Sequence, residues 1–122
     1  MTKRILVVED QVDNRQILRD LLASADYAIT EAENGEEALA AVAKQRPDLI
    51  LMDIQLPIMD GYEATRRIKA NPAWKDIPII VVTSYALSGD EAKARDAGCD
   101  AYVTKPYSPR ALLAKIREYM PK

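Results

Sequence analysis

The feature that most constrains the fold is an alternation, along the whole chain, of short apolar runs with longer amphipathic segments. Three of the runs are entirely aliphatic or nearly so: Ile5–Val8, Leu49–Met52 and Ile79–Val82. Apolar residues that are continuous rather than alternating with polar ones are typical of strands covered on both faces. Tyr27–Glu31 and Ala101–Thr104 contain fewer aliphatic residues, so we expect them to form the outer strands. The alternation therefore predicts an α/β fold with a five-stranded parallel sheet.

The segments between the predicted strands contain start and stop signals of helices. Asn34 with Glu37, and Ser88 with Glu91, have the spacing of capping boxes at the start of the second and fourth helices. Other signals stand at Asp60-Gly61 before the third helix, Asn71-Pro72 after it, Gly98 after the fourth and Ser108-Pro109 before the fifth. The first helix is predicted to turn one apolar face to the sheet, made of Ile17, Leu18, Leu21 and Leu22.

Length and composition narrow the class of protein. A chain of 122 residues with 48% hydrophobic residues fits one domain, residues 1–122. With 17 Lys and Arg against 19 Asp and Glu, the chain has no strong positive field to attract nucleic acid or an anionic membrane. The apolar runs are also far shorter than the roughly 18 residues of a membrane span. The single cysteine, Cys99, cannot form an internal disulfide and suits the reducing cytoplasm.

Charged and polar residues follow the predicted strands at their carboxyl ends, which meet at one edge of a parallel sheet. Glu9 and Asp10 follow the first strand, Asp53 the third, Thr83 the fourth and Lys105 the fifth. Three converging carboxylates repel one another unless a hard cation such as Mg²⁺ lies between them. An ammonium and a hydroxyl beside them can hold the oxygens of a phosphoryl group that an aspartate attacks. The pattern predicts a magnesium site at which Asp53 forms an aspartyl phosphate.

On these residues the chain resembles the receiver domain of response regulators, which act in two-component signalling. The resemblance covers essentially all 122 residues. It rests on five motifs in order: Ile5-Leu6-Val7-Val8-Glu9-Asp10; Asp53-Ile54-Gln55-Leu56-Pro57 with Met59-Asp60-Gly61; Val81-Val82-Thr83-Ser84; Gly98-Cys99-Asp100-Ala101-Tyr102; and Lys105-Pro106. It implies a flavodoxin-like fold, a three-layer α/β/α sandwich of five βα units.

The resemblance also implies a set of roles. Asp53 would accept a phosphoryl group from a histidine kinase or a histidine phosphotransfer protein, with Lys105 and Thr83 assisting. Mg²⁺, with Mn²⁺ as a substitute, would be surrounded by Glu9, Asp10, Asp53 and the backbone carbonyl of Gln55. Thr83 and Tyr102 would form a switch pair, and the Lys105–Pro106 peptide bond is a candidate for the cis isomer.

Phosphorylation adds about one and a half to two negative charges beside Asp53. We expect it to select between two packings of the face formed by the fourth helix, the fifth strand and the fifth helix, where a target protein would bind. The protein would be a monomer or a weak, phosphorylation-dependent dimer. It would catalyse only its own phosphorylation and dephosphorylation, and Gln55 and Tyr85 are expected to tune the lifetime of the phosphate.

Two other functions fit the sequence less well. A phosphatase of the haloacid dehalogenase type also uses an aspartate nucleophile and Mg²⁺, but it needs a second aspartate where this chain has Gln55. Flavin binding is disfavoured because Glu9, Asp10 and Asp13 would repel the flavin phosphate. Two alternatives stay open: an interaction module that works without phosphorylation, and the receiver fragment of a hybrid histidine kinase. The choice among effector, relay and phosphate sink also stays open.

Overall fold

A computed structural model describes residues 2–84 and 90–120. It contains one parallel sheet of five strands, in the spatial order β2-β1-β3-β4-β5. The strands are β1 (Arg4–Val8), β2 (Ala28–Ala32), β3 (Leu49–Met52), β4 (Ile79–Thr83) and β5 (Ala101–Thr104). The three aliphatic runs form the three central strands, and the two weaker runs form the edges. The predicted five-stranded parallel sheet is confirmed.

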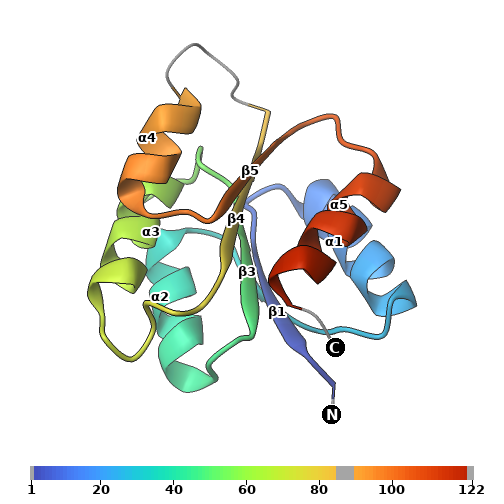
Figure 1. Ribbon diagram of the computed structural model, residues 1–122, viewed down its shortest axis with the longest axis horizontal. Coiled ribbons are helices and arrows are strands. Elements are labelled where there is room, and N and C mark those ends of the chain that lie inside the picture. The colour runs from blue at the N-terminus through green and yellow to red at the C-terminus, as the bar shows by residue number, and fades with distance from the viewer. Residues whose placement is uncertain (1, 85–89, 121–122) are drawn as a thin grey trace.

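Five helices alternate with the strands and cover both faces of the sheet. They are α1 (Val12–Ser24), α2 (Gly35–Lys44), α3 (Gly61–Ala70), α4 (Asp90–Ala97) and α5 (Pro109–Tyr119). Figure 1 shows α2, α3 and α4 on one side of the sheet and α1 and α5 on the other. This arrangement confirms the three-layer, flavodoxin-like fold.

The core consists of two layers because successive side chains of a strand point to opposite faces of the sheet. In β1, Leu6 and Val8 belong to the layer under α2, α3 and α4, whereas Ile5 and Val7 belong to the layer under α1 and α5. All four side chains are at most 1% exposed. The predicted burial of the central strands on both faces is therefore confirmed.

Short polar side chains start three of the helices, as the sequence predicts. The side chains of Asn34 and Asp60 accept hydrogen bonds from the N–H groups of Glu37 and Glu63, each at 2.9 Å. Ser108 accepts from the N–H of Ala111 at 3.3 Å. These contacts satisfy amide groups that have no partner within the helix. The predicted Ser88 cap lies outside the described residues.

One prediction about α1 is wrong. Leu18 and Leu22 are buried, but Ile17 is 58% exposed and does not belong to the inner face. Neighbouring residues of a helix are separated by about 100° around its axis, so Ile17 lies beyond the edge of the face that Leu18 and Leu22 define. It lines a groove on the surface instead.

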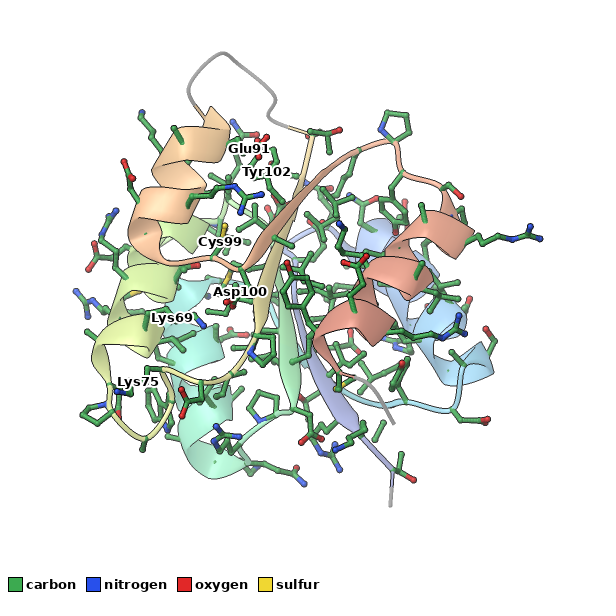
Figure 2. The ribbon with its side chains drawn as sticks, in the orientation of Figure 1. Lys69, Lys75, Glu91, Cys99, Asp100 and Tyr102 are labelled. Atoms are coloured by element: carbon green, nitrogen blue, oxygen red, sulfur yellow. The ribbon has the colours of Figure 1, made fainter. Side chains whose placement is uncertain are left out.

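An ionic contact ties together the loops at the amino-terminal end of the sheet. The Lys69 ammonium donates to the Asp100 carboxylate at 2.9 Å and to the carbonyls of Lys75 and Ile77 at 3.0 and 2.7 Å. Figure 2 shows Lys69 at the end of α3 and Asp100 beside it in the turn before β5. The Asp100 carboxylate also accepts from the N–H of Ile79. The contact joins α3, the start of β4 and the start of β5 far from the predicted site.

Within residues 2–84 and 90–120, no helix is long and apolar enough to cross a bilayer.

Candidate functional site

The three predicted carboxylates lie together at the carboxyl edge of the sheet. Glu9 and Asp10 directly follow β1, and Asp53 directly follows β3. One carboxylate oxygen from each residue can be chosen so that the three lie within 4.8 Å of one another. Glu9 is 2% and Asp53 9% exposed, while Asp10 is half-buried. The neighbouring strands β1 and β3 hold the cluster, since the N–H of Asp53 continues their ladder by donating to the carbonyl of Val8 at 3.0 Å.

Lys105, after β5, supplies a positive charge to this cluster. Its ammonium lies 2.6 Å from a Glu9 oxygen and 3.4 Å from Oδ2 of Asp53. Burial acts to lower the pKa of Lys105, but the hydrogen bond to Glu9 and the charge of Asp53 outweigh it and raise the pKa above its usual value. The ammonium therefore stays protonated at neutral pH. One positive charge faces three carboxylates, so the cluster keeps an excess of negative charge.

The Asp53 carboxylate is held but remains accessible. Oδ1 accepts from the N–H of Ile54 at 2.7 Å, and the side chain is 11% exposed. The side chain lines a polar depression, and its exposed part faces solvent. This depression is lined by Glu9, Asp10, Gln11, Asn14, Asp53, Gln55, Ser84 and Lys105. A phosphoryl group of a donor can therefore approach Asp53 from solvent.

Thr83 and Tyr102, the predicted switch pair, lie on adjacent strands. Tyr102 pairs in register with Val81, two residues before Thr83 on β4. Because residues two apart on a strand point to the same face, the two side chains lie on one face of the sheet in a diagonal relation. Thr83 is fully buried, and Tyr102 packs at the edge of the core layer that contains Ala94 of α4. The arrangement connects the site with the α4 layer.

Two further features border the site. The Lys105–Pro106 peptide bond is cis. An apolar groove runs beside the polar depression and shares Asn14, Ser84 and Lys105 with it. Ile17, Leu18, Pro106, Tyr107 and Pro109 form the remainder of this groove. Of the two residues predicted to tune the phosphate lifetime, Gln55 lines the depression, whereas Tyr85 lies outside the described residues.

Sequence reasoning missed Asn14 and Arg15 in the first turns of α1. Asn14 stands four residues after Asp10, the spacing that brings a helical side chain back towards the preceding loop, and it lines the depression. Arg15 donates to the backbone carbonyls of Glu9 and Asp10. This spacing was the available signal for Asn14, whereas the sequence contains no comparable signal for Arg15.

The donor set fits a small divalent cation. Carboxylate oxygens are the ligands that Mg²⁺ prefers, and Mg²⁺ is commonly bound by one or two carboxylates together with water and phosphate oxygens. The cluster presents such oxygens at the edge of a depression that is open to water. Its excess negative charge would be compensated by the bound cation.

Comparison with known proteins agrees with this geometry. Residues 5–117 match the response regulator receiver domain family. The chain belongs to this family. It is 42% identical over 120 residues to the polar-differentiation response regulator DivK of Brucella anthropi, with 98% of each chain covered.

Two solved structures are similar over the full length of both chains. A putative response regulator from Chloroflexus aurantiacus has a TM-score of 0.95 at 29% identity. The receiver domain of the sensor histidine kinase PA1611 from Pseudomonas aeruginosa has a TM-score of 0.92 at 35% identity, and that structure has a magnesium ion coordinated in the active-site cleft.

The family and the acidic cluster together define the general function. The protein is a response regulator receiver with a phosphoacceptor function in two-component signalling, and it is not a conventional enzyme. Receiver domains bind Mg²⁺ in an acidic active-site cleft of the kind that this chain has, and a response regulator of a two-component system implies a kinase as partner. The predicted class of protein and its cofactor are confirmed.

Proposed function

We propose that Asp53 is the phosphoacceptor and that its phosphorylation switches the binding of a target protein. One observation carries the assignment: Asp53 alone of the three carboxylates follows the central strand β3, and it lies both within 4.8 Å of the acidic pair and 3.4 Å from the ammonium of Lys105. Glu9 is the more deeply buried partner of Lys105, and Asp10 is the more exposed of the pair. Asp53 combines a fixed carboxylate with access from solvent.

In the proposed reaction, an oxygen of Asp53 attacks the phosphorus of a phosphohistidine on the kinase or phosphotransfer protein. The new O–P bond forms as the P–N bond breaks, and the imidazole leaves with the electron pair. The Lys105 ammonium stabilises the charge on the transferring oxygens, and the Thr83 hydroxyl is the proposed donor to the bound phosphoryl group. Mg²⁺ held by the acidic cluster would supply further positive charge at the site.

We assign the cation to Glu9, Asp10, Asp53 and the backbone carbonyl of Gln55, with Mn²⁺ as a substitute. Both oxygens of Glu9 already have partners, one in the ammonium of Lys105 and the other in the N–H of Gln11 at 3.1 Å. Glu9 would therefore hold the cation through a water molecule, whereas Asp10 would bind it directly.

The output is proposed to use the diagonal relation of Thr83 and Tyr102. When Thr83 moves to bond the phosphoryl group, space opens on the α4 face of the sheet, and Tyr102 turns into it. The face of α4, β5 and α5 then has two packings, and a target protein that prefers one of them shifts the population.

The remaining assignments concern the protein as a whole. We treat residues 1–122 as one receiver domain because a single core layer includes both Ile5 of β1 and Met120 after α5. We place the protein in the cytoplasm, in keeping with its single free cysteine. It is expected to be a monomer or a weak, phosphorylation-dependent dimer.

The test is phosphorylation by a small donor. The protein is incubated with acetyl phosphate and Mg²⁺, and its intact mass is measured. We expect the gain of one phosphoryl group, lost in Asp53→Asn and on addition of a chelator, and retained in Asp20→Asn, which changes an exposed aspartate on α1. No mass gain in the wild type, or an equal gain in Asp53→Asn, would refute the assignment. The first of these results would favour an interaction module that works without phosphorylation.

A further inference from the structure

Arg15 makes an unusual set of contacts for a residue near the start of a surface helix. Its side chain is only 12% exposed. Nη1 donates to the carbonyl of Glu9 at 2.9 Å and, more weakly, to the carbonyl of Asp10 at 3.4 Å. Both acceptors belong to the backbone of the loop that carries two of the three carboxylates. The guanidinium thus contacts the peptide groups of the loop.

The same guanidinium is anchored at a second point. Nε donates to the carboxylate of Glu31, on the edge strand β2, at 3.2 Å, and Nη1 lies 3.9 Å from the carboxylate of Glu33. The N–H of Glu9 in turn donates to the carbonyl of Ala32 at 3.0 Å. Glu9 is therefore fixed to β2 at both ends: directly through its amide, and through Arg15 at its carbonyl.

Charge compensation keeps this arrangement compatible with a cation nearby. Glu31 and Glu33 face the positive charge of Arg15 from β2 and the residues after it. Hydrogen bonding to Arg19 lowers the pKa of Glu31, and the charge of Arg15 adds to that effect, so Glu31 stays ionised at neutral pH. Glu31 and Glu33 therefore compensate much of the positive charge of Arg15, which reduces its electrostatic effect at the acidic cluster.

The loop needs such support because its two carboxylates and Asp53 repel one another. A loop free to relax would let Glu9 and Asp10 move apart. The affinity for a cation would then be lower, because part of the binding free energy would be needed to bring the two carboxylates together again. Mg²⁺ demands nearly ideal octahedral geometry, so it is sensitive to how its ligands are held. The planar guanidinium donates to the loop from Nη1 and to β2 from Nε, and the single ammonium nitrogen of a lysine does not reproduce this spacing of two donor nitrogens.

We propose that Arg15 is a positioning residue for the cation site, which acts by holding the backbone of Glu9 and Asp10. The inference rests on the proposed assignment of these two residues to Mg²⁺. Residues that do not bind the metal themselves but hold its ligands in position typically contribute 10- to 100-fold to metal affinity.

The test measures cation binding directly. Mn²⁺ is titrated into the metal-free protein, and the free ion is followed by electron paramagnetic resonance. Arg15→Lys keeps the charge and loses the two-sided contact, so we expect its dissociation constant to rise about tenfold or more. Arg19→Lys is the matched control. Arg19 lies on α1, as Arg15 does, and also pairs with Glu31 of β2. Among the described residues, however, Arg19 has no contact with the loop of Glu9 and Asp10. Its dissociation constant should stay within about twofold of the wild type.

A second variant separates position from charge. Arg15→Gln removes a positive charge near the site, which on charge alone would tighten Mn²⁺ binding, whereas loss of positioning weakens it. We expect weaker binding, and at saturating Mg²⁺ we expect the rate of phosphorylation by acetyl phosphate to return to within about twofold of the wild type. Circular dichroism and urea unfolding identify the conditions under which each variant is folded.

The results that contradict the proposal have two distinct meanings. Folded Arg15→Lys that binds Mn²⁺ like the wild type would overturn the inference, as would Arg15→Gln that binds it more tightly. Wild-type protein that binds no Mn²⁺ would instead overturn the proposed cation site itself, irrespective of Arg15.

Discussion

Substituting Asp10 by Asn should make the metal-free protein more stable. The three carboxylates have oxygens within 4.8 Å of one another, and Lys105 compensates only one of their charges. At an effective dielectric constant of about 20, two unit charges at this distance repel by about 3.5 kcal/mol. Asp10 is half-buried and better solvated than this value assumes, so we expect a gain of about 1–2 kcal/mol in the free energy of unfolding. The amide keeps the size of the side chain and removes its charge.

The assay is urea unfolding of wild type and Asp10→Asn, first with a chelator and then with excess Mg²⁺. Because a cation that binds only the folded state adds RT ln(1 + [L]/Kd) to stability, the wild type should gain from Mg²⁺ and the variant should gain little. The advantage of the variant therefore shrinks or reverses as Mg²⁺ is added. Asp20→Asn, on the exposed face of α1, is the control and should change stability by less than about 0.5 kcal/mol in both conditions. If Asp10→Asn is no more stable than the wild type without metal, the repulsion argument is refuted.

Three further predictions follow from single contacts. The buried hydroxyl of Thr65 has no hydrogen-bond partner among the described residues, so Thr65→Val should raise the free energy of unfolding by about 1 kcal/mol in urea, and a lower value would contradict this reasoning. Gly98 has φ +110°, and a Cβ there would lie 2.8 Å from Cγ of Lys69. Gly98→Ala should therefore lower the free energy of unfolding, measured by thermal denaturation, by about 1–3 kcal/mol. The hydrogen bond to Arg19 lowers the pKa of Glu31, so its contribution to stability is present above the usual pKa of a glutamate and is lost as the pH falls through the lowered value. Glu31→Gln should flatten that acid limb of the stability curve, and an unchanged acid limb would contradict the ion-pair assignment.

Most of the fold could be predicted because its strongest signals are local. A run such as Leu49–Met52 is aliphatic at every position, so it has no polar face to expose and must form a strand buried on both sides. The site followed from one topological rule, that the carboxyl ends of parallel strands share an edge. No distance had to be known for Glu9, Asp10 and Asp53 to be grouped there.

Features that depend on distant contacts could not be predicted. Arg15 differs from any other helical arginine only through its neighbours, and its partner Glu31 is 16 residues away on β2. Ile17 was misplaced because the edge of an apolar face depends on how the helix is rotated against the sheet. Ile58 has φ +70°, a conformation that a β-branched residue rarely adopts. Nothing in the residues around Ile58 indicates this conformation.

The acidic cluster shows why the site and the stability of the fold oppose each other. The repulsion that lowers stability without metal is also what gives the cluster its affinity for a divalent cation, because binding relieves it. Lys105 cannot replace the cation, since its ammonium compensates one charge and is already engaged with Glu9 at 2.6 Å. A neutral cluster would make the fold more stable, but it would lack the carboxylate repulsion that Mg²⁺ binding relieves, and its affinity for Mg²⁺ would be low. The excess charge is therefore best understood as a functional property of this edge of the sheet, and a variant such as Asp10→Asn, which removes it without breaking the ion pair of Glu9 and Lys105, should gain stability and lose metal affinity together.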